Sequence, residues 1–375
     1  MGVLGPAQTN PSDDRRACDQ MARNSRGRLS YIQEWEFGVM QDPSRDKSLG
    51  EYLFPDRQAT FREVVKQLSA AETGPPADNM MTNEDSFTRV AVRLAGRAPQ
   101  HTVYLGVGPD QNFSLIAHAR PDLAFVIDYR RRNVLLHLLH KALFALSEDR
   151  QAYLSRLTAR QVVGRPADLA DAFAAVPLDR AKLDATIGEV ADQLRSLDLL
   201  TPTDLSEIAT MQARLAGPGV EYRFLALKIY PTLKTLMSMP GHMLWEEALY
   251  QRVRSLQKAD RVLPIVADFS DSQAFSRLGP WLTKHGLSVG VIYVSDVEFF
   301  LLRSAKWQSY IENLGRIAWH PEALIVRTST REIDHPQRVR GDSSTTTVGS
   351  MAEFLSAARM GKIRSVDDLF HTPGG

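Results

Sequence analysis

The chain is poor in cysteine and carries almost no net charge. Cys18 is the only cysteine in 375 residues, which excludes an intramolecular disulfide and a cysteine-rich metal site. A single thiol suits a reducing compartment, so we expect a cytoplasmic protein. The formal net charge of +1 provides no global field that would attract nucleic acid or an anionic membrane. We therefore expect neither as a partner, and the composition indicates no oligomeric state.

Long hydrophobic runs are also missing. No uncharged apolar stretch approaches the roughly 20 residues that span a bilayer, and the polar N-terminus lacks the apolar segment of a secretion signal. Apolar residues make up 43% of the chain and charged residues 24%, which is typical of a soluble globular protein. At this length we expect one elaborated domain or two.

Five short apolar segments predict the strands of the fold. They alternate with helical segments such as residues 132–146, whose leucines recur at helical spacing. This alternation predicts an α/β protein with a doubly wound, mostly parallel, Rossmann-like sheet. The predicted strands lie within residues 101–111, 123–129, 262–269, 288–296 and 323–330.

The segments around the predicted sheet differ in composition. Residues 148–255 interrupt the alternation with helical patterns, and we expect them to cap the carboxyl edge of the sheet. The Ser/Thr-rich stretch 341–349 is interpreted as a turn. The expected organisation is a disordered leader (1–27), an N-terminal helical segment (28–96), the first half of the Rossmann core (97–147), a helical insertion (148–255), the second half of the core (256–334) and a C-terminal tail with a helix (335–375).

A glycine turn follows the first predicted strand, at Gly106 and Gly108. Such a turn lets a ligand approach the backbone, and the amino end of the next helix favours polar or anionic groups. Asp128 ends the next predicted strand, where a carboxylate can accept hydrogen bonds from ribose hydroxyls. The pattern favours a nucleoside-containing cofactor; the alternative is that Asp128 only caps the helix that begins near Asn133.

The identity of the cofactor follows from what the loop lacks. It has no glycine at the third position of a dinucleotide fingerprint and no Lys-Ser/Thr pair of a Walker loop. Asp110 at the start of the next helix would repel a pyrophosphate, but not a sulfonium or an ammonium group. S-adenosylmethionine (SAM) is therefore favoured over NAD.

The glycine loop, Asp128, Asp268 and Asp296 follow the order found in class I SAM-dependent methyltransferases. Residues 104–133 and 263–301 resemble more narrowly a bacterial family of methyltransferase-like Rossmann proteins. The resemblance runs from about residue 79 to residue 332. It implies that Gly106 and Gly108 face the methionine part of SAM, Asp128 the ribose and Asp268 the adenine region.

One departure concerns the residues just before the glycine loop. Methyltransferases usually have an acidic residue there, whereas this chain has Tyr104 and Leu105, which leaves Asp110 as a substitute for binding the amino group. The cofactor-binding residues expected on this basis are Asn83, Glu84, Gly106, Gly108, Asp110, Asn112, Asp128, Tyr129, Asp268 and Phe269. Asn83 and Glu84 could close over the cofactor, or Asn83 and Asp85 could cap the following helix.

Asp296 and Glu298 are the candidate catalytic residues. They stand at the carboxyl end of the fourth predicted strand, outside which open α/β sheets bind their ligands. A carboxylate there can act as a general base or orient a nucleophile. The alternative is a strand-end cap or an ion pair with Arg303.

Other polar clusters predict structure rather than chemistry. The arginine run 130–132 could hold an anion, but a solvated face is the favoured interpretation. His137 and His140 have no third ligand nearby in sequence, and neither does the His242–Glu246 pair, so we expect no metal site.

The sequence thus predicts a SAM-dependent methyltransferase-like protein that methylates a small molecule. The helical insertion would shape the acceptor pocket. The alternative is a non-catalytic Rossmann-like protein that binds a nucleoside or acts in regulation, as the missing acidic residue before the glycine loop suggests. An NAD-dependent oxidoreductase ranks below both because the glycine fingerprint is incomplete.

Overall fold

A computed structural model describes residues 57–73, 80–161, 176–217, 237–331 and 333–371. All of them belong to one compact unit, Leu53–Gly375. The expected leader (1–27) and the part of the N-terminal helical segment before residue 57 lie outside the described residues. So does most of the helix expected at 168–176 within the insertion.

The described chain is an α/β structure built on a six-stranded sheet of order β3-β2-β1-β4-β5-β6. Strands β1 to β5 are parallel, which confirms all five predicted strands, and β6 is antiparallel to β5. Every residue of β1 to β4 is buried, because helices cover both faces of a parallel sheet. The strands are β1 (Val103–Val107), β2 (Leu123–Asp128), β3 (Val262–Val266), β4 (Val289–Tyr293), β5 (Trp319–Ser329) and β6 (Thr345–Ser350).

Strand β6 corrects the interpretation of residues 341–349 as a turn. Thr345 to Val348 are buried, and the strand pairs with β5 from Leu324↔Ser350 to Ser329↔Thr345. Threonine is β-branched and favours strands when its side chain packs on a neighbour. Polarity alone suggested a turn, but β5 supplies the neighbour that makes these threonines a strand.

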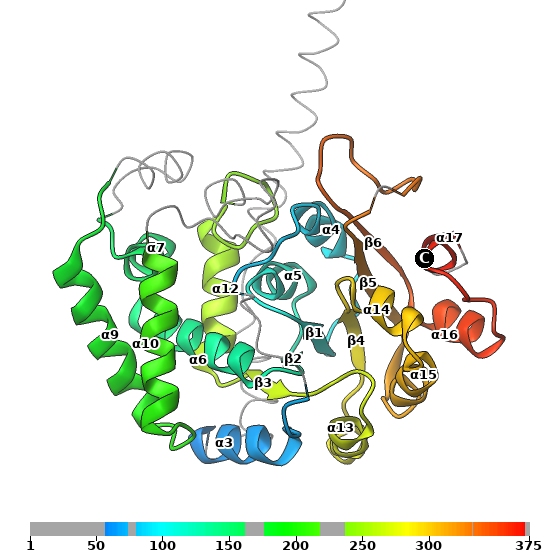
Figure 1. Cartoon of the computed structure of the whole chain (residues 1–375), viewed down its shortest axis with the longest axis horizontal. Helices are drawn as coiled ribbons and strands as arrows, with labels where there is room; N and C mark the ends of the chain where they lie inside the picture. The colour runs from blue at the N-terminus through cyan, green and yellow to red at the C-terminus, as the bar shows by residue number, and fades with distance from the viewer. Residues whose placement is uncertain (1–56, 74–79, 162–175, 218–236, 332, 372–375) are drawn as a thin grey trace, which may run out of the picture. The chain divides into compact units, whose positions relative to one another are not determined.

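Helices form a layer on each face of the sheet (Figure 1). One layer contains α4, α5, α6 and α12, which contact one another and β1, β2, β3 and β6; the other contains α3, α13, α15 and α16. The bounds are α3 (Arg57–Leu68), α4 (Phe87–Leu94), α5 (Gln111–Ala119), α6 (Arg131–Leu146), α12 (Glu247–Lys258), α13 (Ser272–Lys284), α15 (Trp307–Leu314) and α16 (Met351–Arg359).

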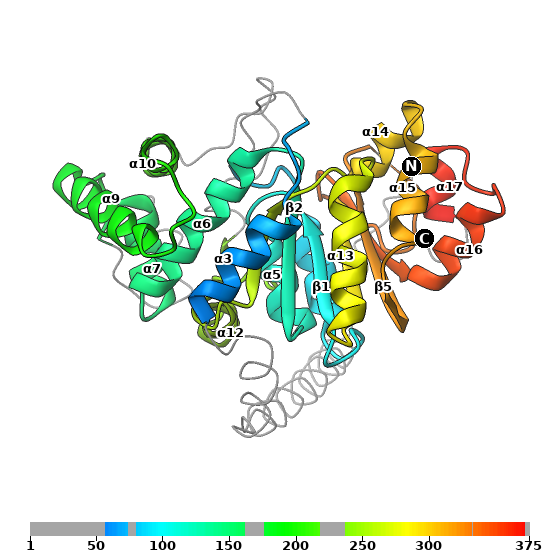
Figure 2. The same cartoon turned by 90° about the horizontal axis from the view of Figure 1, so that it is seen from below.

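The remaining helices gather at the two ends of the sheet (Figures 1 and 2). Helices α7 (Arg150–Thr158), α9 (Arg180–Arg195) and α10 (Pro202–Ala216) belong to the insertion and pack mainly against α6 and one another. Helix α10 begins with a capping box in which the Thr201 and Asp204 side chains each accept the other's backbone N–H. Helices α14 (Val297–Arg303) and α17 (Val366–His371) lie near β5 and β6. The insertion therefore extends the α6 layer sideways, and it reaches the carboxyl edge at the start of α5, as described below.

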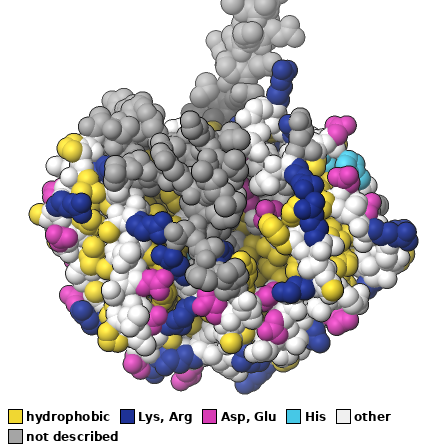
Figure 3. Space-filling view, in the orientation of Figure 1, with side chains coloured by type: hydrophobic (Ala, Val, Ile, Leu, Met, Phe, Trp, Pro, Cys, Tyr) yellow, Lys and Arg dark blue, Asp and Glu magenta, His cyan; other side chains and the backbone are white. Residues whose placement is uncertain are grey.

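The described helices include none that is long and apolar enough to cross a bilayer. On the face drawn in Figure 3, basic and acidic side chains are interspersed. This mixture agrees with the near-zero net charge of the chain.

Candidate functional site

The strand order reverses direction between β1 and β4, which are neighbours in the sheet but lie far apart in sequence. At such a point the connections leave the two strands on opposite faces of the sheet, so a crevice can form outside their carboxyl ends. Val107 ends β1, and Tyr293 ends β4. Any site built at this edge draws its residues from the turns that follow these strands.

Glu84 lies at this edge as a buried carboxylate with three hydroxyl donors. Tyr293 Oη and Thr328 Oγ1 each donate to Glu84 Oε2 at 2.7 Å, and Ser295 Oγ donates to Oε1 at 2.5 Å. Gln111 Nε2 in turn donates to Tyr293 Oη at 3.2 Å. The site thus joins the segment before α4 to the ends of β4 and β5 and to the start of α5.

Burial decides the acidity of Glu84. Loss of solvent raises its pKa from 4.5 to about 7, although the Ser295, Thr328 and Tyr293 hydroxyls lower it in part, and the charge of Asp296 raises it further. A carboxyl with a pKa near neutrality can give or take a proton at physiological pH. The expectation that Glu84 contacts a cofactor stays a prediction; the structure shows a buried carboxyl that three hydroxyls contact.

A recess beside Glu84 lies between the ends of β4 and β5 and helix α17. It has a cavity volume of about 90 Å³, and its lining residues include Ser295, Asp296, Phe299, Thr328 and Arg331. A water molecule needs about 10–15 Å³ on this measure, so the recess accommodates a small molecule. Both candidate catalytic carboxylates line it, since Glu298 is also part of its wall.

The two candidate catalytic carboxylates have different surroundings. Glu298 is 2% exposed and forms an ion pair with Arg327, with Arg327 Nε donating to Glu298 Oε2 at 2.8 Å and Tyr310 Oη donating to Oε1 at 3.0 Å. Asp296 has no side-chain partner among the described residues, and burial raises its pKa above the ordinary value. The structure pairs Glu298 with Arg327 rather than with Arg303, whose guanidinium lies 4.1 Å from the Phe299 ring centroid. Asp296 is therefore the carboxylate with capacity left for a ligand.

Ser295 occupies an unusual backbone conformation between β4 and α14. Its φ is +52°, a left-handed value that costs a non-glycine residue about 1–3 kcal/mol. Its carbonyl accepts a hydrogen bond from the Thr328 N–H at 2.8 Å, which helps to hold the turn. This conformation lets the Ser295 hydroxyl reach Glu84 while the residue still lines the recess.

The glycine loop is filled by its own side chains. A Cβ added at Gly106 would lie 2.0 Å from Asn112 Oδ1 and 2.6 Å from Tyr104 Oη, and Tyr104 Oη donates to that same Oδ1 at 2.8 Å. Asn112 Nδ2 donates to the carbonyls of Val107 and Pro109 at 2.9 and 2.8 Å. Gly106 is therefore required by internal packing, and the Asn112 side chain has little capacity left for a cofactor.

Gly108 has a φ of +85°, which favours glycine in this turn. Its carbonyl accepts hydrogen bonds from Asn112 Nδ2, Asn133 Nδ2 and His137 Nε2 at 3.1, 3.1 and 2.9 Å. The loop is thus held from two helices, α5 and α6. Since His137 donates to this carbonyl, its role here is structural.

Asp128 forms a buried ion pair with Arg130. Arg130 donates from Nε to Oδ1 at 2.8 Å and from an η nitrogen to Oδ2 at 3.0 Å, and its backbone N–H also donates to Oδ1. Asp128 is 1% exposed. The two-pronged guanidinium contact is among the stronger hydrogen-bonded pairs in proteins, so a ribose hydroxyl would compete with Arg130 at this buried carboxylate.

The arginine run is in part the solvated face that we expected, since Arg131 is exposed and Arg132 is half-buried. Arg131 pairs with Asp204 at 2.8 Å and Arg132 with Glu207 at 3.1 Å, while Arg130 is 8% exposed. The run faces carboxylates of its own turn and of α10. It therefore fastens the insertion to the start of α6.

The other expected cofactor residues are also engaged or half-buried. Asp268 accepts from Ser270 Oγ at 2.6 Å and from Thr73 Oγ1 at 3.0 Å, and Lys306 lies 3.8 Å away. Phe269 packs in the core against Phe275. The half-buried Tyr129 has the Arg130 guanidinium 4.9 Å from its ring centroid, and Asn83 is half-buried.

Asp110 lines a second, much smaller cavity. Its Oδ1 accepts from the Thr82 N–H at 3.0 Å, and burial raises its pKa from 3.8 to about 6. His140, Tyr153 and Leu215 contribute to the same lining, which is where the insertion reaches the carboxyl edge. The cavity volume is about 20 Å³, which is room for about one water molecule.

The buried histidines hold no metal constellation. Burial lowers the pKa of His137 to about 4 and that of His140 to about 3, so both are neutral at pH 7. In the part of the chain that the structure describes, no group of three or more His, Cys, Asp or Glu side chains is placed to hold a metal ion.

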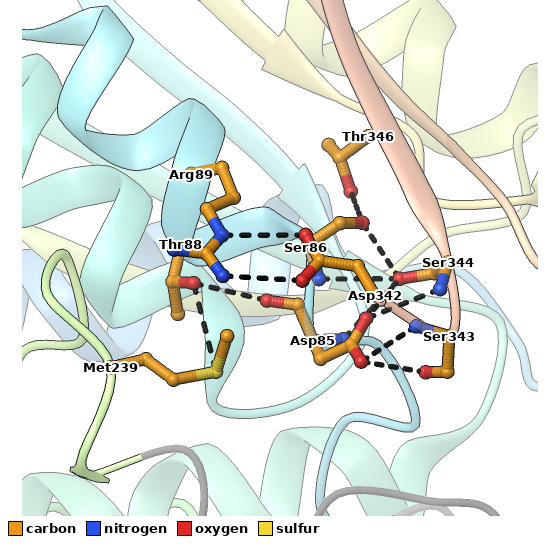
Figure 4. Close-up of polar contacts among 9 residues, drawn as sticks. All are labelled: Asp85, Ser86, Thr88, Arg89, Met239, Asp342, Ser343, Ser344 and Thr346. Carbon is orange, nitrogen blue, oxygen red and sulfur yellow. Dashed lines mark hydrogen bonds and ion pairs between the residues drawn. The ribbon is translucent and has the colours of Figure 1, made fainter. Parts of the chain in front are cut away.

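Helix α4 begins in a set of contacts with the segment that leads into β6 (Figure 4). Asp85 Oδ2 accepts from Ser343 N and Oγ at 2.8 and 2.9 Å, and Asp85 Oδ1 accepts from Ser344 N and Oγ at 3.2 and 2.9 Å. Ser86 Oγ lies 2.7 Å from both Ser344 Oγ and Thr346 Oγ1. These contacts fasten Asp85 and Ser86, the two residues that follow Glu84, to the start of β6 and to the residues just before it.

A family model described as "Domain of unknown function (DUF7790)" matches residues 79–371. The chain belongs to this family. The DUF7790 match includes every candidate site residue from Asn83 to Glu298. No protein with a curated description matches the chain.

The candidate site includes residues that were not anticipated from the sequence, among them Tyr293, Ser295, Thr328 and Thr346. Ser295 directly precedes Asp296 in the turn after β4, so strand-end position could have indicated it. Thr328 and Thr346 carry no local signal, because their role depends on the pairing of β5 with β6. Tyr293 resembles any other buried aromatic residue in a strand.

The residues predicted for SAM do not fit that cofactor as they are arranged. Asp128, Asp268 and Asn112 already have partners for their polar atoms, and Gly106 is needed for packing rather than for approach of a ligand. We therefore derive no reaction step through SAM. Two predicted carboxylates keep acceptor capacity among the described residues: Asp110, which accepts from the Thr82 N–H, and Asp296, which has no side-chain partner.

Proposed function

We propose that this chain is a Rossmann-like α/β enzyme that binds a small polar molecule in the β4–β5 recess and transfers a proton. The observation that carries the proposal is a pair of carboxyl groups: Asp296 lines the recess, and Glu84 lies behind it, in contact with the lining residues Ser295 and Thr328. Glu84 is buried in contact with three hydroxyls, and Asp296 is desolvated without a side-chain partner in the part of the chain that the structure describes. Two neighbouring carboxyl groups in different environments are the arrangement that separates an acid from a base.

In this proposal Asp296 is the general base. A hydroxyl or amine of the bound molecule gives its proton to Asp296, whose raised pKa makes it a better acceptor than an exposed aspartate. Glu84 holds a proton on the far side, and Ser295 links it to the recess. Glu298 and Arg327 form a wall of fixed charge that keeps the recess in shape.

The aromatic and basic lining defines what the recess can hold. Phe299 offers an apolar ring, and the Arg331 guanidinium lies 4.5 Å from the centroid of that ring. A small molecule with a flat or apolar body and a polar hydrogen would match this lining. The cavity volume limits it to a few non-hydrogen atoms inside the recess.

A fragment screen tests the recess directly. Small alcohols, amines and carboxylic acids are screened against the full chain by thermal shift, and the hits are titrated into wild type, Asp296→Asn and Glu322→Gln. Glu322 is an exposed carboxylate toward the amino end of β5, so it is the matched control. We expect ligands that bind wild type and Glu322→Gln at least about tenfold more tightly than Asp296→Asn. Hits that bind all three proteins equally would show that the recess is not the site.

Methyl transfer from SAM is the second candidate function. The strand order, the antiparallel last strand and the positive φ of Gly108 favour it, because this architecture supports nucleoside cofactors at the switch point. It requires Arg130 to leave Asp128. Calorimetric titration with SAM, S-adenosylhomocysteine and NADH, on wild type and Arg130→Gln, tests it.

The titrations with the three ligands distinguish the candidate functions. Micromolar binding of the two adenosyl ligands alone, strengthened in Arg130→Gln, supports a methyltransferase-like pocket that includes Asp128. Adenosyl binding without methyl transfer to any recess ligand favours the non-catalytic alternative. If SAM and S-adenosylhomocysteine do not bind, the methyl-transfer candidate is wrong and the recess proposal stands by itself.

A further inference from the structure

A continuous row of hydroxyl groups connects Glu84 to Asp85. Thr328 Oγ1 lies 2.7 Å from Glu84 Oε2, and Thr346 Oγ1 lies 2.9 Å from Thr328 Oγ1. The row continues through Ser86 Oγ and Ser344 Oγ, each step 2.7 Å, and ends 2.9 Å from Asp85 Oδ1. Figure 4 shows the part from Thr346 to Asp85. It joins a fully buried carboxyl to a half-buried one beside the exposed Ser343.

The number of protons in this row is informative. Five oxygen-to-oxygen contacts connect the two carboxyl groups through four hydroxyls. Each contact needs one hydrogen, and each hydroxyl supplies one. A fifth proton must therefore reside on one of the two carboxyl groups.

Its location follows from the donors around Asp85. Both Asp85 oxygens already accept an N–H and an O–H, from Ser343 at one oxygen and from Ser344 at the other. A carboxylate with four donors is an acceptor and has no need of its own proton. Ser344 Oγ also accepts from the Ser86 N–H at 3.2 Å, which directs its hydroxyl hydrogen toward Asp85. The fifth proton is thus on Glu84, which agrees with burial raising the pKa of Glu84 to about 7. In this state Glu84 Oε2 donates to Thr328 Oγ1, and Thr328 donates to Thr346. Once Glu84 is ionised, Thr328 Oγ1 is instead the donor to Glu84 Oε2.

We propose that Thr328, Thr346, Ser86 and Ser344 form a proton path that exchanges the Glu84 proton with solvent through Asp85. When Glu84 gives up its proton at Oε2, each hydroxyl passes its hydrogen one place along and the last is received at Asp85. No bond other than O–H bonds is made or broken, and the four hydroxyls end with one hydrogen each. Loading from solvent is the reverse sequence.

The path extends the proposed function and rests on it for its use. Ser295 Oγ contacts the other oxygen of Glu84 and lines the recess, so the carboxyl can receive a proton on one side and release it on the other. The titratable groups facing Glu84 are Tyr104 from β1, and Tyr293 and Asp296 from β4 and its turn. Burial raises the pKa of both tyrosines well above the ordinary value, so they stay neutral and do not compete for the proton.

Thr346→Val breaks the path with little change in shape, since a methyl replaces one hydroxyl. Thr347→Val is the matched control, because Thr347 is the next residue in β6 and its buried hydroxyl has no partner among the described residues. Full-length protein labelled with ¹³C-glutamate is mixed rapidly with D₂O at pH 6. Infrared spectroscopy follows the C=O band of the protonated glutamate, identified by its loss in Glu84→Gln.

We expect wild type and Thr347→Val to exchange at the same rate. Thr346→Val should exchange at least about tenfold more slowly than wild type. A missing link can be crossed only when the strand opens locally, which is rare for a buried strand. Ser86→Ala should slow exchange similarly, and the double variant should be no slower than either single variant, since both interrupt one path.

Two results would overturn the proposal. One is equal exchange in wild type and Thr346→Val, which would mean that Glu84 communicates with solvent by another route. The other is a spectrum without a protonated glutamate band that depends on Glu84 at pH 6, which contradicts the proton count. Neither result bears on ligand binding by Asp296, and a failed fragment screen leaves the exchange measurement intact.

Discussion

The carboxyl edge of the sheet has two sides with contrasting chemistry. The closed side comprises the turns after β1, β2 and β3, with Gly106, Asp128 and Asp268. The open side comprises the turns after β4 and β5, with Ser295, Asp296 and Thr328. On the closed side the polar atoms of Asp128, Asp268 and Asn112 are paired with groups of the same chain, whereas on the open side Asp296 has no side-chain partner among the described residues and borders a cavity.

This difference teaches that a motif residue is informative about a ligand only if its hydrogen-bonding capacity is free. The closed side has the glycines and the acidic residue that a nucleoside site needs in sequence. Its glycine makes room for Asn112, and its aspartate holds Arg130. Identity and spacing are the same for a ligand site and for a packed turn, so partner geometry must distinguish them.

The largest expected loss of stability comes from a substitution on the closed side. Asp128→Ala leaves Arg130 buried and without its two-pronged partner, so we expect a loss of about 3–5 kcal/mol in the free energy of unfolding. Urea denaturation measures it. Glu207→Ala removes the carboxylate partner of the partly exposed Arg132 and should cost less than about 1 kcal/mol. Equal and small losses in both would mean that Asp128 is available to a ligand after all.

Acid sensitivity should also arise on the closed side. Burial lowers the pKa of His137 from 6.5 to about 4, so its contribution to stability is complete above pH 6.5 and is lost as pH falls toward 4. The lost contribution is about 3 kcal/mol. Glu84 and Asp110 have raised pKa values and act with the opposite sign, losing stability as pH rises toward about 7 and 6.

His137→Gln removes the titrating imidazole but keeps a donor, because the glutamine amide can still donate to the Gly108 carbonyl. The variant therefore isolates the pH-dependent contribution of His137 to the free energy of unfolding. Thermal or urea unfolding between pH 4 and pH 7 should show a shallower loss of stability in His137→Gln than in wild type. Parallel curves for the two proteins would contradict a neutral, buried His137.

A smaller effect tests the packing of the glycine loop. Gly106→Ala should destabilise the fold by about 1–3 kcal/mol, because the new methyl would overlap Asn112 and Tyr104. Gly188→Ala is the control in the exposed part of α9, where a Cβ meets nothing within 4 Å. It should stabilise the protein by about 0.5–1 kcal/mol. A tolerated Gly106→Ala would show that the loop has space for a ligand.

The smallest expected effect lies on the open side. Asp296→Asn should change the free energy of unfolding by less than about 1 kcal/mol, since the carboxylate has no partner to lose. Glu298→Gln, two residues away, should cost about 3–5 kcal/mol because Arg327 stays buried. Chemical denaturation of the two variants compares them directly. A strong loss in Asp296→Asn would assign Asp296 to structure and remove the distinction between the two sides.

Much of the fold could be predicted from the sequence because its signals are local. The strands β1 to β5 are short apolar runs between glycine turns and helical patterns, and each is where its composition indicated. Strand β6 was missed because its core is Thr345–Thr347, which reads as a polar turn until β5 is placed beside it. Helix α14 was missed because it follows a tight turn after β4 within a stretch that continues to look like a strand.

The site was predictable only in part. Strand-end position located Asp296 and Glu298, and position before the core located Glu84. What each does depends on residues far away in sequence, since Arg327 neutralises Glu298 and Thr328 holds Glu84. Such pairings depend on the order and register of the strands, which cannot be deduced from local patterns in a single sequence.

Strand β6 also has a consequence for the order in which the protein is made. Thr346 follows Glu84 by 262 residues, and ribosomes add about 5–20 residues per second, so roughly 13–52 s separate their synthesis. During this interval the Glu84 segment exists without the strand on which its hydroxyl row depends. A chain truncated before residue 345 would still contain Glu84 and Asp296, yet it could not assemble the row of hydroxyls between Glu84 and Asp85. Synthesis of β6 therefore completes the hydroxyl row, and α17, which lines the recess, follows it.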